Sequence, residues 1–164
     1  MAQRLLKLFE EYVNDIKTGS SETTHTWSEI RDAIQMKRPF VIIVFRTKQG
    51  YLDYLESSFK PQDYIKQSAF MDLDGKRVRY PSVFYTLEED RDTESDVRKL
   101  YEKFPIKAII IGESNRDSAT LYSQDGSSSE FGNEIISTIE ERDFVTEDYF
   151  KIGSTFYRFI EFND

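Results

Sequence analysis

The sequence predicts an α+β (or α/β) fold, in which a mixed β-sheet with two buried central strands and antiparallel hairpins is covered by about five helices. Two short apolar runs, 40–45 and 106–112, lack the polar alternation of half-buried strands, which indicates strands buried on both faces. Each run follows an amphipathic, helix-like segment. The chain has 164 residues with no internal repeat or linker, so residues 1–164 are expected to form a single globular domain.

Two helices are expected near the N-terminus. Apolar residues at helical spacing over 5–16 predict the first helix, which Thr18-Gly19-Ser20 is expected to end. The small polar residues that follow, up to Thr26, predict a loop. Thr26 and Glu29 form a capping-box pattern that begins the second helix, and Pro39 ends it.

The middle of the chain predicts a short third helix and a hairpin. Apolar residues over 51–59 have helical spacing, and Pro61 closes that helix. From 64 to 80 the pattern changes to period 2, and the turn-rich residues 72–75 lie at its centre. This pattern predicts a β-hairpin, whose second strand is extended by residues 83–85.

The second half of the chain predicts two further helices and two further strand regions. Thr93 opens a fourth helix, which Pro105 ends before the second buried strand. Residues 119–122 are compatible with a short strand. Phe131, Ile135, Ile136 and Ile139 have helical spacing and predict the fifth helix.

A C-terminal hairpin is expected over 149–162. Gly153-Ser154 is a glycine-first pair that fits a type II′ turn. Aromatic residues including Phe156 and Phe159 make both of its faces apolar, which indicates burial on both sides. The hairpin is therefore expected either to lie beneath helices or to form a homomeric interface.

Composition excludes several kinds of chemistry. The chain has no Cys, so it has no disulfide, thiolate metal site or Cys nucleophile. His25 is its single histidine, which excludes two-histidine mechanisms, and its polar surroundings indicate a surface side chain. There is no P-loop, no dinucleotide-binding glycine pattern and no apolar run long enough for a membrane span, and the charged, helix-like opening residues lead us to expect no signal peptide. We therefore expect no bound cofactor, no catalytic residue and no metal.

The acidity is concentrated in two segments. The formal net charge is −8. Residues 88–96 carry −5 and residues 140–148 carry −4, so the remaining residues together carry +1. Such segments repel nucleic acid and membranes and attract basic protein surfaces, although acids also occur simply as solvated groups at helix starts. The candidate partner-binding residues are Glu88, Glu89, Asp90, Asp92, Glu94, Asp96, Glu140, Glu141 and Asp143.

A second hypothesis is a magnesium-assisted phosphoesterase or nuclease. Glu113, Ser114 and Arg116 directly follow a buried strand, the position where open α/β sheets bind ligands. In this hypothesis Asp72, Asp74 and Glu113 hold Mg²⁺ through oxygen ligands, and Arg116 holds a phosphate. Asp72 and Asp74 are also the residue types that a hairpin turn requires.

A third hypothesis is a single-stranded nucleic-acid binder. Arg77 and Arg79 fall on one face of a predicted strand, close to Tyr80. Cations interleaved with aromatic rings can follow a phosphate backbone and stack on bases. The net negative charge and the small number of cations oppose this hypothesis.

The opening residues Leu5-Leu6-Lys7-Leu8-Phe9-Glu10-Glu11-Tyr12-Val13 resemble the N-termini of small proteins of T4-like tailed phages. The high Tyr, Phe and Asp content is similar to theirs as well. The resemblance implies a virion component or an early protein that blocks a host system, in the host cytoplasm or the virion.

Taken together, the patterns favour a non-enzymatic, cytoplasmic protein that binds a basic protein surface through its acidic segments, without membrane contact. The magnesium-dependent enzyme and the nucleic-acid binder remain the alternatives.

Overall fold

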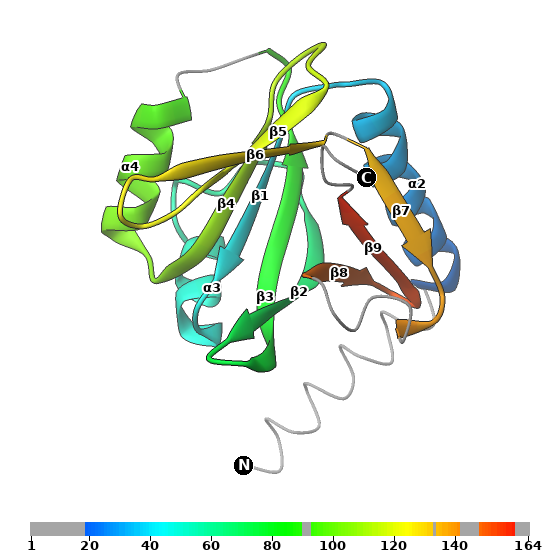
Figure 1. Cartoon of the computed structure of the whole chain (residues 1–164), viewed down its shortest axis with the longest axis horizontal. Coiled ribbons are helices and arrows are strands. Elements are labelled where there is room, and N and C mark those ends of the chain that lie inside the picture. Colours follow the sequence, from blue (N-terminus) through cyan, green and yellow to red (C-terminus); the bar gives the residue numbers. More distant parts are fainter. Residues whose placement is uncertain (1–18, 90–92, 133, 142–147, 160–164) are drawn as a thin grey trace.

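The chain forms a nine-stranded antiparallel β-sheet that curls into a half-barrel, with three helices packed against its two faces (Figure 1). The computed structural model describes residues 19–89, 93–132, 134–141 and 148–159, and these counts refer to that part of the chain. The strand order across the sheet is β6-β5-β4-β1-β3-β2-β8-β9-β7.

The helices are α2 (Gly19–Gln35), α3 (Lys48–Leu55) and α4 (Thr93–Lys103). The strands are β1 (Phe40–Phe45), β2 (Ile65–Leu73), β3 (Lys76–Thr86), β4 (Ile106–Gly112), β5 (Ser118–Tyr122), β6 (Ser128–Gly132), β7 (Ile135–Thr138), β8 (Tyr149–Ile152) and β9 (Thr155–Phe159). None of these helices is both long enough and apolar enough to cross a membrane.

The expected α+β fold with a mixed sheet and about five helices is wrong, because the described chain is mostly β and its strands are antiparallel. The segment expected as the fifth helix forms the end of β6 and all of β7. Phe131 and Ile135 of that segment pack against the core of the sheet, while β5 and β9 pair with its backbone. The adjacent β-branched pair Ile135-Ile136 suits strand pairing better than it suits a helix.

The N-terminal part of α2 is a second difference. Thr18-Gly19-Ser20 was expected to end a helix and residues 21–26 to form a loop, but α2 is continuous from Gly19, so His25 lies on a helix. Serine and threonine lower helix propensity by only about 0.7 kcal/mol or less per residue, which does not prevent a helix. The helix expected over 5–16 lies outside the described residues.

The two buried central strands are confirmed as β1 and β4, which lie side by side and pair antiparallel. Phe40 and Ile42 point to the inner, concave face, where α2 packs. Val41 and Ile43 point to the outer face, where α3 and α4 pack. Helices on both sides therefore explain why these strands are apolar on both faces without being parallel.

Both predicted hairpins are confirmed. Asp74 and Gly75 connect β2 to β3 with φ of 53° and 82°, the positive pair that a type I′ turn requires. Gly153, with φ of 58°, begins the turn between β8 and β9. Phe159 packs in the inner core, whereas Phe156 packs against the outer face, so the C-terminal hairpin is apolar on both faces as expected.

Candidate functional site: the acidic end of the sheet

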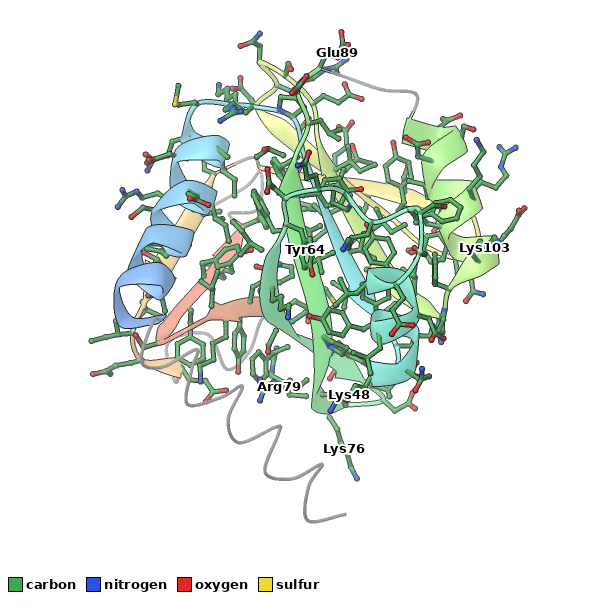
Figure 2. All side chains as sticks on the ribbon, turned by 180° about the vertical axis from the view of Figure 1, so that it is seen from behind. Lys48, Tyr64, Lys76, Arg79, Glu89 and Lys103 are labelled. Carbon is green, nitrogen blue, oxygen red and sulfur yellow. The ribbon has the colours of Figure 1, made fainter. Side chains whose placement is uncertain are left out.

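The register of the sheet separates the predicted site residues into two groups. Strand β3 begins at the β2–β3 turn, and its other end, Thr86, pairs with Phe40, which in turn pairs with Gly112. At roughly 3.3 Å per residue, Arg77 and Thr86 are about 30 Å apart. Figure 2 shows these two ends, with Glu89 at one and Lys76 at the other.

The first acidic segment lies at the Thr86 end. Leu87 donates its backbone N–H to the carbonyl of Pro39 at 2.9 Å and packs in the outer core, which fixes where the chain leaves β3. The described acids that follow, here called the acidic rim, are Glu88, Glu89, Glu94 and Asp96. Asp90 and Asp92 lie outside the described residues.

The acids of the rim differ in what holds them. Glu94 and Asp96 occupy the first turn of α4, where a carboxylate gains about 0.3–1 kcal/mol from the helix dipole. Glu88 and Glu89 are exposed, and neither has a hydrogen-bond or ion-pair partner in the described part of the chain. These two carboxylates are therefore available to an external cation.

The second acidic segment lies at the opposite end of the sheet and is bound to the protein itself. Asp148 lies 3.9 Å from the Arg77 guanidinium and accepts the backbone N–H of Asp72 at 3.3 Å. Glu141 accepts a hydrogen bond from the Tyr149 hydroxyl. Burial, reinforced by this contact with Glu141, raises the pKa of Tyr149 to about 12. The two acidic segments thus form separate surfaces; Glu140 is exposed near the second, and Asp143 lies outside the described residues.

The loop after β4 lies at the rim end, but its charged groups are paired. The Arg116 guanidinium lies 3.1 Å from the Glu113 carboxylate, and Asp117 forms an ion pair with Lys37. The backbone N–H of Asn115 also donates to the carbonyl of Lys37 at 3.0 Å. These contacts attach the loop, including the half-buried Ser114, to the C-terminal end of α2.

The carboxylates proposed for Mg²⁺ do not come together. Asp72 and Asp74 lie at the β2–β3 turn, whereas Glu113 follows β4 at the rim end. The separation of about 30 Å is far beyond the roughly 2.0–2.6 Å reach of each ligand bond. Among the described residues, no three His, Cys, Asp or Glu side chains are grouped so as to hold a metal ion.

The residues proposed to bind single-stranded nucleic acid lie on opposite faces of β3. The Tyr80 side chain is 5% exposed in the inner core, so its ring cannot stack on a base. Arg77 and Arg79 share the outer face, as expected from their spacing. Arg77 lies 5.2 Å from the centre of the Tyr149 ring, and Arg79 donates to the Ser68 hydroxyl at 2.9 Å.

A groove at the rim end was not predicted from the sequence. It has a volume of about 740 Å³ and lies between α2 and the adjoining ends of β2 and β3. Its floor includes Ile65 and Phe84, and its charged lining residues are Glu29, Asp32, Asp63 and Arg38. The sequence analysis did not identify this wall, although the helical spacing of Glu29, Asp32 and Met36 places them on one face of α2.

The groove is continuous with the acidic rim. Thr86 lines the groove, and the chain passes from it through Leu87 to Glu88 and Glu89. Asp32 is paired with Arg31 at 3.4 Å, whereas Glu29 and Asp63 have no ion-pair partner among the described residues. The rim end of the sheet therefore combines a hollow with a surplus of carboxylates.

Comparisons with known proteins gave no match to this chain among family models, curated proteins or solved structures. Its function must therefore be inferred from geometry and charge.

Proposed function

We propose that this chain is a non-enzymatic protein-binding module that docks a basic protein surface on its acidic rim and the adjoining groove. The observation that carries the proposal is the contrast between the two ends of the sheet. Asp148 and Glu141 at one end are engaged by the protein's own groups, whereas Glu88 and Glu89 at the other end are exposed and unpaired among the described residues.

Electrostatics supports the proposal. Like charges placed together at a helix start oppose folding, and capping α4 needs only acids in its first turn, such as Glu94 and Asp96. Glu88 and Glu89 add repulsion without adding a helix contact. A concentrated negative surface increases the rate at which a positive partner is captured, by about 10- to 1,000-fold in favourable cases.

The resemblance to proteins of T4-like phages extends the proposal to the biological setting, which would be a phage infection. In that setting the basic partner is either a host protein that the chain blocks or a neighbouring component of a virion. The host cytoplasm or the virion is then the compartment.

The proposal is tested with two charge-reversal variants of equal net charge. One is Glu88→Lys with Glu89→Lys on the rim. Its matched control is Glu56→Lys with Glu102→Lys, two exposed acids at the C-terminal ends of α3 and α4, near the opposite end of the sheet where β1 ends and β4 begins. The probe is a fluorescein-labelled oligolysine, and stopped-flow fluorescence gives its association rate constant. Thermal unfolding of both variants checks that the fold is intact, since exposed charges are usually worth less than about 1 kcal/mol.

We expect the rim variant to lower the association rate constant about tenfold or more at 0.01 M salt, and the control to lower it less than about threefold. At 1 M salt, where the Debye length is about 3 Å, the two variants should converge with the wild type. An equal decrease for both variants would mean that net charge alone governs binding, and the proposal would fail.

A further inference from the structure

An open stretch of strand edge directly follows Ile65, the residue of β2 that lines the groove. Strand β2 pairs with β3 over its full length from Ile65 to Leu73. On its other edge, β2 pairs with β8 only from Ser68 to Phe70. Strand β8 then ends in the turn that begins at Gly153, so within the described residues no strand pairs with the outer edge of β2 before Ser68.

The backbone groups of Lys66 point to this open edge. Leu73 and Lys76 flank a two-residue turn and form a hydrogen-bonded pair, so odd-numbered residues of β2 direct their N–H and C=O groups to β3. Even-numbered residues direct them outward. The backbone N–H of Asp72 confirms this parity, because it donates to Asp148 just before β8. Lys66 has the same parity, and its N–H and C=O have no partner in the described part of the chain.

The lining of the groove determines what kind of segment fits beside this edge. Residues 62–65 line the groove, and α2 forms the opposite wall with Glu29 and Asp32. Three carboxylates and one guanidinium give the lining a net negative charge, while Phe84 and Ile65 make its floor apolar. Strands β6 and β7 also have an open edge at the two ends of the sheet, but no residue of either lines this groove.

We propose that the groove binds an extended, basic peptide segment of the partner, which adds to the open edge of β2 as a further strand beside Lys66. The proposal rests on the proposed function, because it takes the partner to be basic. In this mode of recognition the backbone hydrogen bonds supply affinity, and alternating side chains supply selectivity. Long cationic side chains can lie along the partly exposed Ile65 and place their charged ends near Glu29 and Asp63.

The test uses a synthetic peptide with the sequence acetyl-Lys-Val-Lys-Val-Lys-Val-Lys-amide. Because Lys and Val alternate, shifting the peptide by one residue turns either the Lys or the Val side chains toward the floor of the groove. The assay therefore does not depend on one particular register. Two control peptides are the backbone N-methylated form, whose amides cannot donate strand hydrogen bonds and whose methyl groups hinder strand pairing, and a form with Glu in place of Lys. Isothermal titration calorimetry measures each dissociation constant.

The protein variants isolate the backbone contact. Lys66→Pro removes the outward N–H, and the ladder to β3 does not use that group, so proline is tolerated there as at other strand edges. Lys66→Ala keeps the N–H and removes the same side chain. We expect Lys66→Pro to weaken binding about tenfold or more and Lys66→Ala to change it less than about threefold.

N-methylation of the peptide should weaken binding to the wild type by a similar factor, which keeps the test valid if Lys66→Pro does not fold. Equal affinity for the N-methylated peptide would overturn the strand addition. If in that case the Glu88→Lys, Glu89→Lys variant still weakens binding, the rim proposal survives while this one fails. Equal affinity for the Glu-containing peptide would overturn the basic specificity.

Discussion

At the residue scale, a series of buried polar contacts crosses the inner face of the sheet. The Tyr157 hydroxyl on β9 donates to the side-chain carbonyl of Gln67 on β2 at 2.6 Å. Gln67 donates in turn to the Ser82 hydroxyl at 3.3 Å, and Ser82 donates to the carbonyl of Ile43 at 2.8 Å. Buried polar groups cost free energy unless they are paired, so this series of contacts restricts how these four strands align.

Replacing Tyr157 by Phe should lower the free energy of unfolding by about 1–3 kcal/mol at pH 7, because the buried carbonyl of Gln67 loses its donor. Urea unfolding followed by circular dichroism measures the change. Tyr122→Phe is the control, since the Tyr122 hydroxyl has no partner in the described chain, and it should change the free energy by less than about 0.5 kcal/mol. Equal values for the two variants would contradict the role of this contact.

The same variant should also change the alkaline stability. Burial raises the pKa of Tyr157 above its ordinary value of 10.0. Above about pH 10 the tyrosine of the unfolded chain loses its proton while that of the folded chain keeps it, so stability falls by up to about 1.4 kcal/mol per pH unit. The difference in free energy of unfolding between wild type and Tyr157→Phe should therefore shrink between pH 8 and pH 11. A constant difference would contradict a raised pKa of Tyr157 in the folded protein.

At the element scale, the sequence predicts the elements whose signals are local. The runs 40–45 and 106–112 are apolar on both faces, and Asp74-Gly75 supplies the positive φ angles of its turn, so these elements are as expected. Residues 128–138 were predicted wrongly, because Phe131 and Ile135 fit a helical spacing by chance. Their strand conformation depends on pairing with β5 and β9, which are distant in the chain and leave no local signal.

The C-terminal hairpin closes the half-barrel. The Phe159 ring on β9 lies 5.0 Å from the ring of Phe131 on β6, near the other end of the sheet, and 6.0 Å from that of Phe40 on β1. This hairpin therefore packs in the chain's own inner core, which was one of the two arrangements expected for it.

Replacing Phe159 by Asp should lower the free energy of unfolding by at least about 3 kcal/mol, because it removes these ring contacts and places a charge in the inner core. The control Ile139→Asp, at a side chain 77% exposed, should cost less than about 1 kcal/mol. Urea unfolding gives the stability, and size-exclusion chromatography gives the oligomeric state. An unchanged stability and size would contradict the packing described here.

At the scale of the whole molecule, the two acidic segments could be predicted from the sequence, but their separation could not. Register places Glu89 and Asp148 at opposite ends of the sheet. Among the described strands, β2 and β4 run in opposite directions, so Asp72 and Glu113 lie at opposite ends as well. The groove likewise combines residues from α2, from the start of β2 and from the end of β3. Only the antiparallel strand order brings these three segments together.

Amide chemical shifts test most directly whether the rim end is the binding surface. Proton–nitrogen spectra of the ¹⁵N-labelled protein are recorded during titration with the Lys-Val peptide, and the shift of every amide is compared between the two ends of the sheet. The largest shifts are expected at Glu88 and Glu89 and over residues 62–66. Largest shifts at the β2–β3 turn and Asp148, or equal shifts over all exposed acids, would contradict the account.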